Sequence, residues 1–472
     1  MTRDPDAGPT GRELYADYSA LWHLESIRVL ETLREMAGKP PPARPARVAI
    51  IDTSVARDHP CLTEAIDADL ALDLFSTRLG AFTYADPARE EERLRVRALP
   101  NLGTDIAAGL PVAEALLAEF VDRLSPGQPV HPGGIGPAAA PDFSAHGTAV
   151  AGLVGARPAV MALAPPGAPA GTPPAELPLP YCGVDPFCRI VPVSTNFDPD
   201  PEALILAFLY AEVIDAQVVL VPRSLPDPFR TPPELARVAA GPGTLLEAVH
   251  PCEIGPREAE LWEELARLIV RVSQRRVVVC AAGNDQEVGA IYPANLAAED
   301  NGVVAVGAAN AKGLVSGYSD PTSATILGPS DDGEVFDRRT VRLDIQAAGY
   351  DAQGVPAQNR NADFSHFEIV TTDVPGLHGY AFSPFASEEP EDGLREFGSY
   401  FCRFGGTSAA SAIVAGLLSL GHSLGRIAPD ADGPGAKGWL LAHAVTVSGD
   451  GRAPFHFPSW DGVHVTFPGL GL

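Results

Sequence analysis

The sequence is poor in lysine and has no cysteine pattern that would hold a metal. Only three of its 472 residues are lysine (Lys39, Lys312 and Lys437), and the net charge is −26. Because no basic surface offsets phosphate repulsion, we expect no nucleic-acid partner. The six cysteines include no Cys-x-x-Cys pair and no histidine at ligand spacing, which argues against a zinc site.

Long apolar segments are also missing. No stretch approaches the roughly 18 apolar residues that a membrane-spanning helix needs. The polar start, Met-Thr-Arg-Asp-Pro-Asp, lacks the apolar core of a signal peptide. We therefore expect a cytoplasmic protein with no membrane partner. Its hydrophobic share of 46% is enough for a large core.

Apolar segments typical of buried strands alternate with helical segments along the chain. Expected strands cover residues 48–52, 189–193, 218–221, 303–307 and 341–345, and another runs from Arg276 into a turn at Asn284. Expected helices cover residues 11–37, 88–99, 112–124, 201–215, 257–274 and 437–444, with two more beginning at His146 and near Ser408. This alternation predicts an α/β fold with a mainly parallel sheet and helices on both faces.

The 472 residues could make two or three average domains, and a single elaborated α/β domain is also possible. Residues 1–46 read as a helical extension and a proline-rich linker, and residues 47–472 as the domain. Insertions are expected near residues 76–140, 156–181, 226–258 and 350–398. The Ala/Pro-rich segment 156–181 reads as a surface loop. The extension either packs outside the domain, which we favour, or acts as an inhibitory or docking arm.

Four polar residues stand at the ends of apolar segments. Asp52 ends a strand, His146 opens a helix of small residues, Asn284 follows a strand, and Ser408 opens an almost wholly apolar helix. Three of them have a plain structural reading: a turn or cap for Asp52, a structural histidine for His146, and a helix cap for Ser408. Together they supply the nucleophile, base, orienting acid and oxyanion donor that acyl transfer by a serine requires.

The order of these residues along the chain and the short sequences around them resemble those of subtilisin-like serine proteases. Ile51-Asp-Thr is similar to the aspartate box of that family, and His146-Gly-Thr-Ala-Val-Ala-Gly to its histidine box. Ala281-Ala-Gly-Asn resembles the oxyanion box, and Gly406-Thr-Ser-Ala-Ala the nucleophile box. The resemblance covers roughly residues 47–75, 142–155, 189–224, 267–349 and 399–446.

This resemblance implies a three-layer subtilisin-like fold and a serine endopeptidase acting on a protein or peptide substrate. It would make Ser408 the nucleophile, His146 the proton shuttle and Asp52 the group that orients the imidazole. Asn284 and the Ser408 backbone N–H would hold the oxyanion. The chemistry needs no metal or other cofactor. Family members often bind structural calcium, but no compact acidic loop here specifies it.

Several departures from the family pattern mark a divergent branch. Ser54 stands where glycine is usual, Ala149 where a second histidine is frequent, and Ala412 where proline is expected. The altered pattern keeps an alternative open, in which a catalytically latent subtilase fold serves as a peptide-binding or assembly module. Long insertions near the site favour a selective or regulated protease, with room for a regulatory protein partner.

The substrate-binding residues are the least well marked in the sequence. Ser224 and Leu225 either represent the usual Ser-Leu-Gly of the substrate-binding strand, shifted by two residues, or that motif is lost. Gly283, in the oxyanion box, is also expected to line the substrate site. Ile291 would form the floor of the primary specificity pocket and make it apolar.

Overall fold

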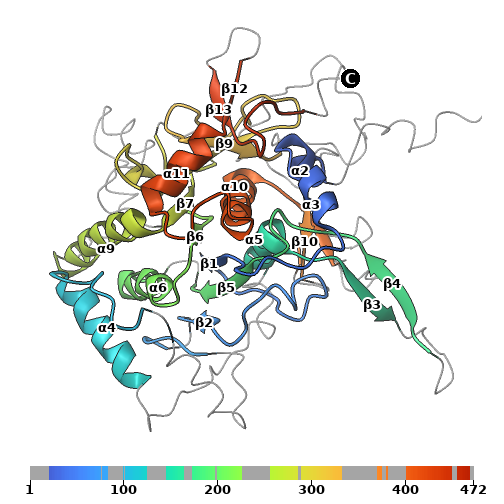
Figure 1. The fold of residues 1–472 in the computed structure, drawn as a ribbon. Coiled ribbons are helices and arrows are strands. Elements are labelled where there is room, and N and C mark those ends of the chain that lie inside the picture. Colours follow the sequence, from blue (N-terminus) through green and yellow to red (C-terminus); the bar gives the residue numbers. More distant parts are fainter. Residues whose placement is uncertain are drawn as a thin grey trace, which may run out of the picture.

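A parallel sheet of seven strands lies at the centre of the part of the chain that the structure describes (Figure 1). From edge to edge its strands are β2 (Leu72–Asp73), β5 (Arg189–Ser194), β1 (Arg47–Asp52), β6 (Val218–Val221), β7 (Val277–Ala281), β8 (Val303–Ala309) and β9 (Ile326–Pro329). All neighbouring pairs are parallel. The expectation of a mainly parallel sheet is confirmed.

This computed structural model describes residues 21–75, 77–82, 99, 101–124, 145–163, 173–196, 199–225, 256–284, 289–331, 369–374, 379–380, 400–448 and 454–467. The helix expected over 88–99, apart from Leu99, and the strand expected over 341–345 lie outside these residues.

The strands form because short apolar runs can be buried on both faces at once. Successive side chains of a strand point to opposite faces. In β1, Val48 and Ile50 therefore belong to one hydrophobic core, and Ala49 and Ile51 to the other. Both cores are continuous with helices, so the molecule has three layers.

In the part of the chain that the structure describes, six helices cover the two faces of the sheet. One core includes residues of α5 (Ala145–Gly155), α10 (Gly406–Ser423) and α11 (Gly433–Ala442); the other includes residues of α4 (Pro111–Arg123), α6 (Pro201–Val213) and α9 (Pro256–Arg275). A 3-10 turn, η5 (Ala294–Leu296), precedes β8. Every residue of α10 except His422 is buried, as its apolar sequence predicts.

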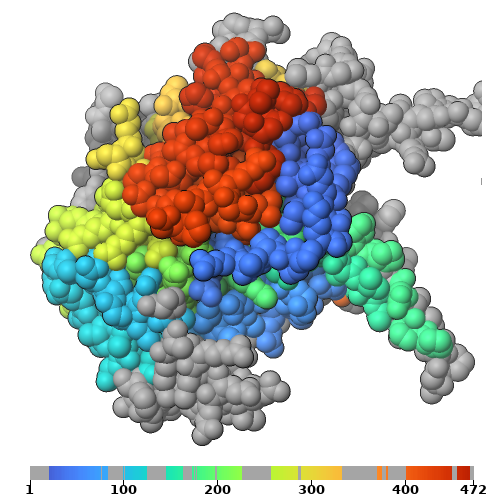
Figure 2. All heavy atoms as spheres, viewed as in Figure 1, coloured from blue at the N-terminus to red at the C-terminus, as the bar shows by residue number. Residues whose placement is uncertain are grey.

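Among the described residues, three antiparallel pairs lie outside the central sheet. They are β3 (Ala159–Leu163) with β4 (Ala175–Leu179), β10 (Ile369–Thr372) with β11 (Phe401–Phe404), and β12 (Val445–Val447) with β13 (Phe455–Phe457). The expectation of a surface loop over residues 156–181 is therefore wrong for β3 and β4. These two strands pair through their backbones and project from the body of the molecule (Figure 2). The Ala/Pro bias of this segment hid two short apolar strands.

The start of the described chain forms two helices, where the sequence predicts a single helix over 11–37. They are α2 (Trp22–Ser26) and α3 (Leu30–Met36). The chain turns between them at Arg28, whose φ of 66° lies in the left-handed region and cannot continue a right-handed helix.

The helix α2 packs against the C-terminal segment. Trp22 is fully buried, and the backbone N–H of Trp460 donates to the carbonyl of Ile27 at 2.8 Å. Figure 2 shows these N-terminal residues in blue, directly beside the C-terminal residues in red. The linker that follows is fixed to the last turn of α10, because the N–H of Ala46 donates to the Ser423 hydroxyl at 2.9 Å.

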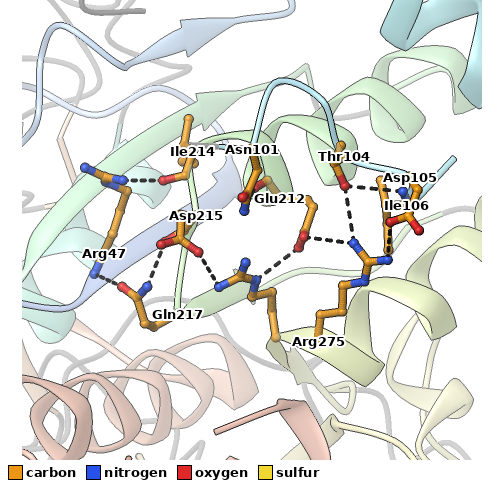
Figure 3. A network of polar contacts seen from close by, with 11 residues as sticks. Arg47, Asn101, Thr104, Asp105, Ile106, Glu212, Ile214, Asp215, Gln217 and Arg275 are labelled. Carbon is orange, nitrogen blue, oxygen red and sulfur yellow. Dashed lines mark hydrogen bonds and ion pairs between the residues drawn. The ribbon is translucent and has the colours of Figure 1, made fainter. Parts of the chain in front are cut away.

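An ion-pair network ties the segment before α4 to α6 and α9 (Figure 3). The buried carboxylate of Glu212 contacts Arg275 at 3.3 Å and Arg276 at 3.0 Å. The two arginines also contact Asp105 and Asp215, each at 2.6 Å. Part of the segment expected as an insertion over 76–140 is therefore joined to the main body.

Candidate active site

Asp52 is the last residue of β1 and lies at the carboxyl edge of the sheet, where ligand sites of open parallel sheets occur. Its side chain is fully buried. One carboxylate oxygen accepts the backbone N–H of Thr53 at 2.7 Å, and the other lies 2.7 Å from Nδ1 of His146. These two contacts satisfy the buried acid and fix its orientation.

His146 reaches Asp52 because the start of α5 lies directly on the chain that leaves β1. A Cβ on Gly147 would lie 2.5 Å from the carbonyl oxygen of Thr53, so only glycine allows this approach. The Gly147 N–H also donates to the Thr53 hydroxyl at 2.9 Å. Because Asp52 accepts at Nδ1, the proton is assigned to that nitrogen, which leaves Nε2 with a lone pair.

Aromatic side chains also pack near the imidazole of His146. The ring of Phe404 contacts His146 edge-on, with centroids 5.4 Å apart, and Tyr380 packs on Phe404 at 5.9 Å. Burial, with the negative charge of Asp52 nearby, raises the pKa of Tyr380 well above its usual range, so this phenol is neutral. The imidazole side chain remains 17% exposed, which leaves it accessible to a small reactant.

Ser408 lies in the first turn of α10, two residues after the helix begins at Gly406. Its hydroxyl donates to the carbonyl oxygen of Pro222 at 2.6 Å. Pro222 follows β6, the strand next to β1, so Ser408 and Asp52 meet at neighbouring strand ends. Within the described chain, no hydrogen bond joins Ser408 to His146.

Two of the first three N–H groups of α10 already have acceptors. The Gly406 N–H donates to Asp331 at 3.0 Å, and the Thr407 N–H to Oδ1 of Asn284 at 2.8 Å. The Ser408 N–H is left without an acceptor among the described residues. A helix start with one open N–H is suited to bind a negative oxygen.

The amide orientation of Asn284 follows from its partner. Both the N–H and the hydroxyl of Thr407 donate to the same amide oxygen, at 2.8 and 3.0 Å. A backbone N–H can only donate, so the atom facing it must be oxygen. The NH2 group of Asn284 therefore points the other way, and no described residue accepts from it.

The residues expected to bind substrate divide into two groups. Gly283 and Ile291 lie together beside Asn284: Gly283 has a φ of +118°, and a Cβ there would lie 2.8 Å from the Ile291 side chain. Leu225 is buried in the core, with its N–H on the carbonyl of Tyr292 at 3.0 Å. Ser224 next to it is exposed.

Sequence reasoning missed two charged neighbours of the site. The guanidinium of Arg223 lies 3.9 Å from Asp52, and Asp331 holds Gly406. Both follow strands of the sheet, at the same edge as Asp52. A search for charged residues after every expected strand would have found them.

The described residues contain no group of three His, Cys, Asp or Glu side chains placed to hold a metal ion. Among the same residues, no helix is both long and apolar enough to cross a bilayer.

The model of the subtilase family (peptidase S8) matches residues 44–427, well over half of the chain. The chain belongs to the subtilase family. This subtilase is a peptide hydrolase of the serine protease class. The subtilisin-like fold expected from the sequence is confirmed.

Solved structures of similar fold include bacterial proteases. The epidermin leader peptide processing serine protease (EpiP) from Staphylococcus aureus has a TM-score of 0.50 and 15% identity, covering 96% of this chain and 81% of that one. The nisin leader peptidase NisP from Lactococcus lactis has a TM-score of 0.46 and 14% identity, covering 93% and 92%. None of the curated proteins matches this subtilase by sequence.

Proposed function

We propose that this subtilase is a serine endopeptidase in which the hydroxyl oxygen of Ser408 attacks the carbonyl carbon of a peptide bond. Nε2 of His146 takes the hydroxyl proton and passes it to the leaving amine. The new oxygen–carbon bond replaces the carbon–nitrogen bond, and water then hydrolyses the acyl-enzyme by the same route. Asp52 keeps Nδ1 protonated, so that Nε2 is the nitrogen that accepts.

One observation carries this proposal. Two hydrogen-bond donors, the Ser408 N–H and the NH2 group of Asn284, have no acceptor among the described residues, and Thr407, which holds the oxygen of the Asn284 amide, directly precedes Ser408. We assign both to the negative oxygen of the tetrahedral intermediate, which would give each donor its partner. Fixed donors of this kind stabilise a developing oxyanion at no cost in reorganisation.

The hydroxyl must rotate before it reacts. It donates its hydrogen bond to the Pro222 carbonyl at 2.6 Å and not to His146. This contact also favours a second candidate function, a latent subtilase fold that binds peptides without cleaving them. In the enzyme proposal, the hydrogen bond to Pro222 breaks when substrate is present and one to Nε2 of His146 replaces it.

Labelling with a fluorophosphonate separates the two candidates. The enzyme proposal expects covalent labelling of the wild type, none of Ser408→Ala, and normal labelling of Ser411→Ala. Ser411 is the matched control because it is also a buried serine of α10, and its hydroxyl donates to the Ser408 carbonyl at 2.9 Å. A folded wild type that stays unlabelled would favour the latent module.

We also propose that the enzyme acts on selected peptides in the cytoplasm and that a partner protein regulates it. The packing of Ile291 against Gly283 supports selectivity, because it puts an apolar side chain beside the residue that precedes Asn284. The cysteines of the described residues, Cys61, Cys182, Cys188, Cys280 and Cys402, are free thiols, which suits a reducing compartment.

A further inference from the structure

We propose that Asp331 is a positioning residue for the reaction at Ser408. Its carboxylate holds the Gly405–Gly406 turn in the conformation that leaves the Ser408 N–H open and places the Thr407 N–H on the amide oxygen of Asn284. This assignment rests on the proposed role of Ser408. It gives a part in the reaction to a second buried acid, in addition to Asp52, His146 and Ser408.

Asp331 lies two residues after β9 and is 5% exposed. One carboxylate oxygen accepts the Gly406 N–H at 3.0 Å and the Tyr318 hydroxyl at 2.5 Å. The neighbouring Ser330 donates its hydroxyl to the Gly406 carbonyl at 2.8 Å. The N–H and the carbonyl of the same glycine are therefore both held by side chains from the end of β9.

The turn is shaped around this carboxylate. A Cβ on Gly405 would lie 2.2 Å from the Asp331 carboxyl carbon, so no other residue fits there. Gly406 has a φ of +76°, and a Cβ there would lie 3.0 Å from the Asn284 amide nitrogen. One glycine makes room for the acid, and the other supplies a left-handed turn against the amide.

A chain of contacts leads from Asp331 to the oxyanion donors. Asp331 fixes Gly406, the next residue Thr407 fixes the oxygen of Asn284, and the residue after it is Ser408. Without the carboxylate, the Gly406 N–H would be a buried donor with no acceptor. The turn would rotate to pair it, moving Thr407 and the two donors that are proposed to meet the oxyanion.

If Asp331 has this positioning role, replacing it should weaken stabilisation of the transition state and leave substrate binding unchanged. With p-nitrophenyl acetate as the probe, Asp331→Ala should lower kcat by about 10-fold, less than the factor of 10² to 10³ for complete removal of one oxyanion donor. KM should stay within about twofold of the wild type, because uniform binding is untouched. Asp331→Asn keeps an acceptor oxygen and should recover part of the loss, and Tyr318→Phe should fall between that variant and the wild type.

Asp185→Asn is the matched control. Asp185 is also fully buried, and it accepts hydroxyl hydrogen bonds on α10, from Ser419 at 2.6 Å and Ser423 at 2.8 Å. Those contacts lie three to four turns away from Ser408. Loss of a buried carboxylate should therefore lower the melting temperature of this control and leave its kcat unchanged.

The outcomes separate the positioning role from the proposed function. An Asp185→Asn kcat that falls as far as that of Asp331→Asn would overturn the positioning role, as would wild-type kcat in both Asp331→Asn and Tyr318→Phe. These two conservative variants decide the matter if Asp331→Ala does not fold. A wild type that neither hydrolyses the ester nor reacts with a fluorophosphonate would overturn the proposed function and the positioning role together.

Discussion

At the scale of single residues, the site depends on which hydrogen-bond donors are used and which stay open. Asp52 and His146 form a hydrogen bond with each other, and the Thr407 N–H donates to the amide oxygen of Asn284. Among the described residues, the Ser408 N–H and the Asn284 NH2 group have no acceptor. The chemistry assigned to the serine follows from these unused groups as much as from the bonded ones.

Removal of the Asn284 amide is the simplest test that its NH2 group is a donor to the oxyanion. Asn284→Ala should lower kcat by about 10² to 10³, the range that loss of one oxyanion donor costs in a subtilisin, with little change in KM. Steady-state kinetics on a cleaved peptide would measure both constants. A rise in KM at constant kcat would instead assign Asn284 to substrate binding.

Ile291 should limit the size of the substrate side chain next to the cleaved bond. Its side chain lies against Gly283, beside Asn284. Ile291→Ala should raise kcat/KM for a peptide with phenylalanine at that position by about 10-fold relative to one with alanine, since even one methylene group in an apolar pocket changes discrimination by about 1–3 kcal/mol. An unchanged ratio would place the specificity pocket elsewhere.

The sequence predicts residues at this scale only in part. The four boxes are local, so the position of Asp52 at a strand end and of His146 at a helix start could be read directly. The contact between Asp331 and Gly406 joins residues 75 apart in the chain, and the contact between Thr407 and Asn284 joins residues 123 apart. No local pattern records such a pairing, because it depends on how β9, β7 and α10 pack.

At the scale of elements, α10 links the candidate site to the N-terminal arm. Its first turn carries Ser408, and its last turn accepts the N–H of Ala46 on the Ser423 hydroxyl. The two ends lie roughly 25 Å apart, given the 1.5 Å rise per residue of a helix. The described part of the arm therefore contacts the far end of α10, which favours packing over inhibition.

Trp22 should make the largest single contribution of this arm to stability. Trp22→Ala should lower the free energy of unfolding by about 3–5 kcal/mol, the usual cost of emptying a buried tryptophan site. Urea titration measures the change, and Leu33→Ala, on the partly exposed helix α3, should cost less. Unchanged stability combined with higher peptidase activity would support an inhibitory arm instead.

At the scale of the whole molecule, the sequence predicts the central sheet and the helices that cover it. It does not predict the β3–β4 pair or the break between the two N-terminal helices. Runs such as Val218–Val221 and Val277–Ala281 are apolar enough to be strands only in a buried parallel sheet. The pairing of β3 with β4 depends on two short segments meeting across a turn, and composition obscured it. The break at Arg28 has no sequence signal, since arginine favours helix.

One buried histidine, His23, and one half-buried histidine, His422, make the whole fold sensitive to acid. Burial lowers the pKa of His23 to about 3 and that of His422 to about 4, from an ordinary value of 6.5. The unfolded chain therefore binds protons below pH 6.5 that the folded chain refuses. Stability should fall as the pH drops from 6.5 towards 4, by up to about 1.4 kcal/mol per pH unit for each histidine.

Urea titrations at pH 7 and pH 5 measure this slope. His23→Leu should flatten it, because the variant has one fewer group to protonate on unfolding. His464→Leu serves as the control, since the His464 side chain is 56% exposed. If the His23→Leu protein lost as much stability between the two pH values as the wild type, acid sensitivity would have to arise elsewhere.

Hydrolysis of peptide bonds by Ser408 is the central claim, and a peptide library tests it most directly. The library is incubated with the wild type and with Ser408→Ala, and new chain ends are identified by mass spectrometry. We expect the wild type to generate internal cleavages with a shared residue preference, and Ser408→Ala to generate none. Equal cleavage by both proteins, or none by a folded wild type that binds the peptides, would contradict the claim.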